Sequence, residues 1–138
     1  MINIERAYEF ANMYYDWVCD CLTKDEKYEE LVFFKLGVDL AVRQSELIDI
    51  NFNQIEFPYV TNIEVKKLNM IRPSYYEPKE ISSDTYVLLM DTLYDENKDK
   101  IFNKSLSDYI ISIMESIGDE NFNGHMMRKL GTILHFGE

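Results

Sequence analysis

The side chains able to do metal or thiol chemistry are few and lie far apart in the chain. Cys19 and Cys21 are the only cysteines, and His125 and His135 are the only histidines. On a helix the two thiols would project about 160° apart, so they could not share one tetrahedral metal ion. Their spacing to the histidines matches no common zinc module. The sequence therefore predicts buried cysteines and no metal site.

Carboxylate pairs offer a second kind of cation site. Asp16 with Asp20, and Asp95 with Asp99, have the four-residue spacing that could bring two carboxylates to one divalent cation. Such pairs are also common on solvated helix faces, which is the simpler interpretation. The chain has no glycine-rich phosphate loop, no G-x-S-x-G elbow and no H-E-x-x-H motif. We expect no cofactor and a protein that is not an enzyme.

Arg128 and His135 are the remaining pair of residues that could take part in a reaction. They are seven residues apart, hence on one face of a C-terminal helix, with His125 beside them. An Arg-x(4–6)-His pair on a helix of a small all-α domain is similar to the motif of the HEPN ribonucleases. The resemblance covers only Arg128 to His135, and it implies that both residues act on an RNA backbone, usually across a dimer. Lys129 departs from that motif and Gly131 is expected to interrupt the helix, so a basic solvent face is the alternative.

A row of carboxylates on the expected first helix is the most distinctive surface pattern. Its members, which fall within about 60° on a helical wheel, are Glu5, Glu9, Asp16 and Asp20. Neighbouring carboxylates in such a row repel each other by up to roughly 0.5 kcal/mol per pair. One interpretation is a solvated helix face. The other is a row that imitates nucleic-acid phosphates for a basic protein groove, with Trp17 as an apolar contact.

The overall charge narrows the class of partner. The 138 residues include 25 acidic and 14 basic side chains, which gives a net charge of -11. Nucleic-acid binders are normally basic, so direct binding of DNA or RNA is disfavoured. No apolar run approaches the length of a membrane span, and no basic region precedes an apolar core at the N-terminus. These features, with two cysteines and no disulfide framework, predict a cytoplasmic protein without membrane contact.

The elements that position these residues are predicted to be mostly helical. A first helix runs from a cap at Asn3 to about Leu22. The sequence 23–26, Thr-Lys-Asp-Glu, has the form of a capping box that would open a second helix through Asp49. Apolar residues also alternate strictly over 32–42, so a strand is the alternative there.

The middle of the chain breaks the helical pattern. The three prolines, Pro58, Pro73 and Pro78, all fall within it, and proline is excluded from helix interiors. Residues 63–71 fit either a short helix or the second arm of a hairpin. We therefore expect an irregular region at about 50–80, either loop or short β-hairpin.

Helical signals return in the last third of the chain. Asp84 is the expected cap of one helix, and Ser105 begins another that should stop at Gly118. The last helix is expected to start near Asp119 or Asn121. The prediction is a single acidic domain over 1–138, mainly α, built as a compact bundle of about five helices around the irregular middle.

Charge and size together predict a non-enzymatic binding or inhibitor protein that blocks a basic, nucleic-acid-handling partner. Anti-CRISPR and other phage counter-defence proteins, immunity proteins and antitoxins work in this way as a class. The alternatives are a HEPN-like ribonuclease using Arg128 and His135, and an accessory subunit of a larger complex. A homodimer, in which the carboxylate row of one copy meets the basic face of the last helix of another, is a further prediction.

Overall fold

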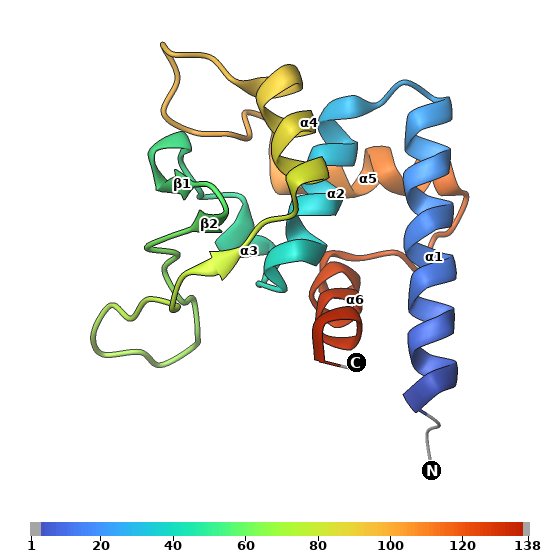
Figure 1. The fold of residues 1–138 in the computed structure, drawn as a ribbon, viewed down its shortest axis with the longest axis horizontal. Helices are drawn as coiled ribbons and strands as arrows, with labels where there is room; N and C mark the ends of the chain where they lie inside the picture. The colour runs from blue at the N-terminus through green and yellow to red at the C-terminus, as the bar shows by residue number, and fades with distance from the viewer. Residues whose placement is uncertain (1–3, 137–138) are drawn as a thin grey trace.

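The computed structural model describes residues 4–136 and is mostly helical (Figure 1). In this part of the chain the elements are α1 (Ile4–Lys24), α2 (Tyr28–Leu40), α3 (Gln44–Leu47), a 3-10 turn (Phe52–Gln54), β1 (Ile55–Glu56), β2 (Tyr59–Val60), β3 (Lys79–Glu80), α4 (Ser83–Leu93), α5 (Leu106–Ile117) and α6 (Gly124–Phe136). The predicted mainly α fold with a short hairpin in the middle is confirmed. The expected cap Asn3 lies outside the described residues.

Helix α2 is the centre of the domain. Most of its side chains are buried: Leu31, Val32, Phe33, Phe34, Leu36, Val38 and Leu40. It contacts α1, α4, α5 and α6, which surround it in Figure 1. A helix that is apolar on nearly every side must be covered on nearly every side. The predicted helix is therefore correct in this stretch, and the strand alternative is wrong.

The predicted single helix from Thr23 to Asp49 is interrupted twice. Thr23 is not a cap, because it lies in the last turn of α1 and its hydroxyl donates to the Cys19 carbonyl at 2.8 Å. The chain then reverses through Glu26, which has a left-handed φ of 57°. A second left-handed residue, Ala41 with φ 52°, ends α2 before the short α3. Local capping signals misled the prediction because two positive-φ residues, neither of them glycine, make these turns.

The small sheet occupies the irregular middle. Its strands are antiparallel in the order β1–β2–β3, with Ile55 opposite Val60 and Val60 opposite Lys79. Residues 63–71 contain no helix, so that alternative is wrong. The start of this stretch pairs with the chain beyond the loop, because Glu64 forms an isolated antiparallel bridge with Tyr75 and the Val65 N–H donates to the Ser74 carbonyl at 2.8 Å. The remaining residues form a loop between these contacts.

The caps of the later helices depend on short polar side chains. Ser82, rather than the expected Asp84, caps α4 by accepting from the Thr85 N–H at 3.3 Å. Ser105 accepts from the Asp108 N–H at 3.2 Å and Gly118 ends α5 with φ 69°, both as predicted. Helix α6 begins only at Gly124, because a turn precedes it in which Asp119 accepts from the Asn121 N–H at 2.9 Å.

One buried carboxylate ties the helices to the irregular middle. Glu46, only 2% exposed, accepts from the backbone N–H groups of Arg43 and Lys66, both at 2.7 Å. It also accepts from the Tyr76 hydroxyl at 2.9 Å and the Arg43 guanidinium at 3.1 Å. Burial alone would raise the pKa of this carboxyl, but the four hydrogen bonds together hold it below its usual range.

Candidate functional site

The predicted carboxylate row lies on the outer side of α1. Glu5, Glu9, Asp16 and Asp20 are all exposed there. The opposite side of the helix enters the core through Ala11, Val18 and Leu22. Among the described residues, no cation lies within ion-pair distance of Glu9, Asp16 or Asp20. The structure therefore leaves these three charges uncompensated.

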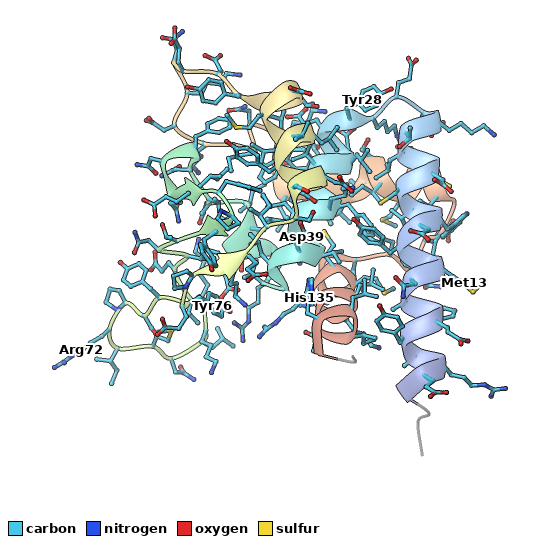
Figure 2. The ribbon with its side chains drawn as sticks, in the orientation of Figure 1. Met13, Tyr28, Asp39, Arg72, Tyr76 and His135 are labelled. Atoms are coloured by element: carbon cyan, nitrogen blue, oxygen red, sulfur yellow. The ribbon has the colours of Figure 1, made fainter. Side chains whose placement is uncertain are left out.

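An exposed row of apolar side chains runs beside the carboxylates. Phe10 is 68% exposed, Met13 72% and Trp17 42%. Their spacing of three and four residues places them along one side of the helix, next to the acidic row. Met13 points away from the body of the molecule in Figure 2. Of the three, the sequence prediction of the binding surface included Trp17 alone; the spacing of Met13 from Phe10 and Trp17 was the signal that could have added it.

Tyr14 packs against two members of this apolar row, Phe10 and Trp17. Its ring stacks on Phe10 with 6.3 Å between centroids and meets Trp17 edge-on at 5.6 Å. Its hydroxyl donates to Asp119, in the turn before α6, at 3.4 Å. Burial, followed by the charge and hydrogen bond of Asp119, raises the pKa of Tyr14 to about 12, so the hydroxyl stays a donor at neutral pH. The aromatic side chains of the apolar row are thus linked to the bundle.

We define the outer face of α1 as two adjoining rows. The acidic row consists of Glu5, Glu9, Asp16 and Asp20, and the apolar row consists of Phe10, Met13 and Trp17. Interfaces combine such features, with apolar anchors that supply energy and a charged rim that steers the encounter. All the residues predicted for partner binding lie on this one face.

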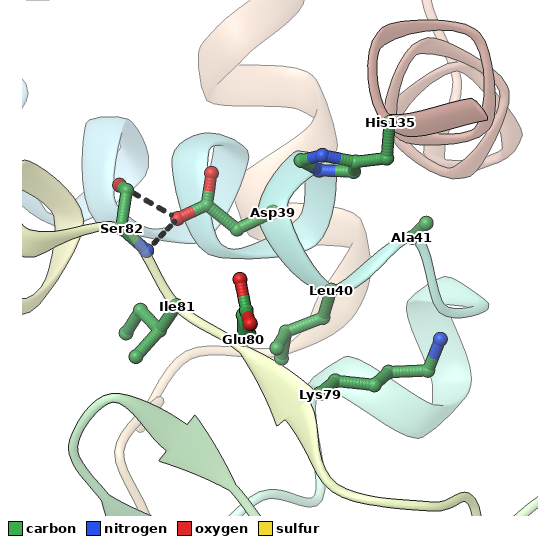
Figure 3. A pocket seen from close by; sticks show the side chains of 8 residues that line it. All are labelled: Asp39, Leu40, Ala41, Lys79, Glu80, Ile81, Ser82 and His135. Carbon is green, nitrogen blue, oxygen red and sulfur yellow. Dashed lines mark hydrogen bonds between the residues drawn. The ribbon is translucent and has the colours of Figure 1, made fainter. Parts of the chain in front are cut away.

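A separate open pocket of about 540 Å³ lies where α2, β3 and α6 meet (Figure 3). It is lined by Asp39, Leu40, Ala41, Lys79, Glu80, Ile81, Ser82 and His135. The Asp39 carboxylate accepts from the Ser82 N–H at 3.0 Å and the Ser82 hydroxyl at 2.9 Å, which closes the polar wall of the pocket. The lining combines two acids, one lysine, one serine and one histidine with apolar side chains.

Arg128 and His135, the pair predicted from the ribonuclease motif, face different neighbours. His135 Nε2 lies 3.2 Å from the Val38 carbonyl oxygen at the end of α2. Arg128 lies near Tyr76 and Lys79. Burial is the largest cause that lowers the pKa of Lys79, and the positive charge of Arg128 is the second. Sequence reasoning missed Lys79, because only the fold brings β3 to α6. These contacts leave the ribonuclease hypothesis a prediction.

The cysteines lie in α1, half-buried. Burial raises the pKa of the Cys19 thiol to about 11, with the nearby Lys35 acting against it, so the thiol is neutral at physiological pH. Within residues 4–136, no group of three or more histidine, cysteine, aspartate or glutamate side chains is placed to hold a metal ion. None of the helices in that range is both long and apolar enough to cross a bilayer.

No protein-family model, curated protein or solved structure matches this chain. A functional assignment therefore rests on the surfaces of the chain itself. The outer face of α1 differs more from an ordinary solvated surface than the pocket between α2, β3 and α6 does. It exposes three large apolar side chains beside carboxylates.

Proposed function

We propose that this protein is a non-enzymatic binding protein whose outer face of α1 docks on a basic surface of another protein. The observation that supports the proposal is the exposed row of Phe10, Met13 and Trp17 beside the unpaired carboxylates Glu9, Asp16 and Asp20. A solvated helix face would not need the apolar row. A buried core face would not carry the acidic one.

The two rows have different tasks in this proposal. Ion pairs at an exposed rim contribute only about 0–1 kcal/mol each, so the carboxylates mainly steer the encounter. Full burial of a large apolar side chain contributes roughly 1.5–3 kcal/mol. Trp17 and Phe10 are aromatic, the type of residue that most often dominates interface energy. The carboxylates select a basic partner, and the apolar row holds it.

The finer proposal concerns the kind of partner. A line of negative charge on a rigid helix resembles the phosphates of a nucleic-acid strand in sign and linear arrangement. A protein groove that handles nucleic acid is basic and can accept such a line. The protein then acts as an inhibitor by occupying that groove, in the manner of anti-CRISPR proteins, immunity proteins and antitoxins.

Affinity capture from cells that make the protein tests the proposal. The variant pair Glu9→Lys with Asp16→Lys changes the outer face of α1. The matched control pair, Asp91→Lys with Glu96→Lys, makes the same change in net charge at exposed positions away from it. We expect the wild type and the control to bind the same basic partner, with affinity that falls steeply as salt rises, because exposed charges are screened within about 8 Å at physiological ionic strength.

The α1 variant should differ from the control in kinetics. Reversing two steering charges should slow association more than it speeds dissociation. Surface plasmon resonance with the captured partner measures both rates. Equal effects of the two variant pairs, or an affinity unaffected by salt and by charge reversal, would remove the outer face of α1 from consideration.

A further inference from the structure

The loop over residues 67–72 exposes apolar side chains to an unusual degree. Leu68 is 94% exposed and Ile71 97% exposed, and Met70 beside them is 37% exposed. Isolated exposed apolar residues are ordinary on protein surfaces, but a cluster at the end of a projecting loop marks a binding surface. We call residues 67–72 the tip loop.

The tip loop is basic in a strongly acidic chain. Lys67 and Arg72 stand at its two ends, and it contains no acidic residue. Among the described residues, no carboxylate lies within ion-pair distance of either cation, whereas the preceding Lys66 is paired with Asp49. The tip loop thus presents apolar side chains between two uncompensated positive charges.

The base of the loop is fixed to the domain. The Lys66 N–H donates to the buried Glu46 carboxylate at 2.7 Å, and the Tyr76 N–H donates to the Ile63 carbonyl at 2.9 Å. Asn69, with a left-handed φ of 66°, turns the chain at the tip. These contacts aim the tip loop in a defined direction, away from the bundle (Figure 1).

The outer face of α1 and the tip loop are complementary and lie on opposite sides of the molecule. One combines apolar side chains with carboxylates, the other apolar side chains with cations. Met13 and Arg72 point outward from opposite ends of the view in Figure 2. The two surfaces therefore cannot meet within one molecule, but they can meet between two.

We propose that the tip loop of one molecule docks on the outer face of α1 of a second copy. Leu68 and Ile71 pack on the apolar row, while Lys67 and Arg72 approach the carboxylates. The contact is head-to-tail, so each pair leaves one free tip loop and one free α1 face, and further copies can add. The inference does not rest on the proposed function. Where both hold, a basic partner and a second copy compete for the same face.

The contact is small. A hexapeptide loop on one helix face buries less than the roughly 1,200 Å² at which stable interfaces begin. We therefore expect weak association, visible at high micromolar concentration, that is reduced by salt because charges at its rim are exposed.

Mixing two variants tests this arrangement directly by sedimentation equilibrium. Leu68→Ser with Ile71→Ser removes the tip loop contact, and Phe10→Ser with Met13→Ser removes the α1 contact. All four side chains are exposed enough that the fold should survive, which circular dichroism verifies. Each variant alone should stay at the mass of one 16.4 kDa chain. An equimolar mixture should form a 1:1 pair of twice that mass, since each variant retains the surface that the other lacks.

A control and a competing occupant complete the experiment. The pair Val87→Ser with Ile111→Ser removes exposed apolar side chains elsewhere on the surface and should associate like the wild type. A mixture that remains at the mass of one chain overturns the proposal. So does a tip loop that instead binds vesicles of phosphatidylserine and phosphatidylcholine without any complementation between variants. Neither result affects the capture experiment for the basic partner.

Discussion

The buried Glu46 carboxylate fixes part of the irregular middle of the chain to the helices. It accepts four hydrogen bonds while buried, and they come from three different segments. In Glu46→Gln the side-chain amide would present N–H donors to backbone N–H donors. We expect the free energy of unfolding to fall by about 2–3 kcal/mol, the range for lost hydrogen bonds to a charged group. Urea denaturation at pH 7 measures this, and exposed Glu56→Gln should change stability by less than about 0.5 kcal/mol.

The same carboxyl predicts a pH dependence. Its pKa in the folded protein lies below its ordinary value, so near pH 4 the unfolded chain binds more protons than the folded one. The stabilisation is full above the unfolded pKa and is lost as pH falls through the folded pKa. The stability gap between wild type and Glu46→Gln should therefore narrow below about pH 4. Urea titrations from pH 7 to pH 3 measure it, and a constant gap would contradict the assignment.

Single residues were the least predictable level of the structure. The carboxylate row was legible because helical spacing alone brings its members together. Glu46 is buried because α3 turns it toward Tyr76 and the backbone of Lys66. The position of Lys79 beside Arg128 likewise depends on a contact between β3 and α6, which are far apart in the sequence. No local pattern carries such information.

The packing of α6 on α2 makes a prediction at the scale of elements. Replacing a helical glycine by alanine usually stabilises a helix by about 1 kcal/mol. At Gly131, however, an added Cβ would lie 2.2 Å from the Val38 carbonyl oxygen and 2.8 Å from the Ala41 Cβ. We expect Gly131→Ala to destabilise the protein by about 1–3 kcal/mol, because the two helices would have to separate.

Thermal unfolding measures the effect, with Thr132→Ala at the next, exposed position as the control. The control should be neutral or slightly stabilising, since alanine is the better helix former. A gain in stability from Gly131→Ala would show that α6 does not approach α2 as closely as described.

Element boundaries were predictable where local chemistry decides them. Ser105 and Gly118 frame α5 as expected, because a hydroxyl cap and a left-handed glycine need no distant partner. The helix ends at Glu26 and Ala41 were not predicted, because neither residue type favours a positive φ. Residues 63–71 fitted either a short helix or a hairpin arm, and the sequence did not indicate that Leu68 and Ile71 would be almost fully exposed.

At the scale of the whole molecule, charge is distributed unevenly. The net charge of -11 includes the exposed acidic row on α1, while a basic loop projects from the opposite end. Composition alone predicted an acidic domain with a basic partner. Of the adjoining apolar row, the prediction included only Trp17, and the structure shows that Phe10 and Met13 are exposed beside it.

Site-specific photo-crosslinking in cells that make the protein tests the central claim most directly. A photoreactive amino acid replaces Met13 on the outer face of α1 or, as control, Ile111 on α5, both exposed. The Leu68→Ser and Ile71→Ser changes are included so that a second copy cannot occupy the face. The proposed function predicts that the Met13 probe crosslinks to one basic protein, and that Glu9→Lys with Asp16→Lys abolishes this crosslinked product. Equal products from the Met13 and Ile111 probes, or a product that survives the charge reversal, would contradict it.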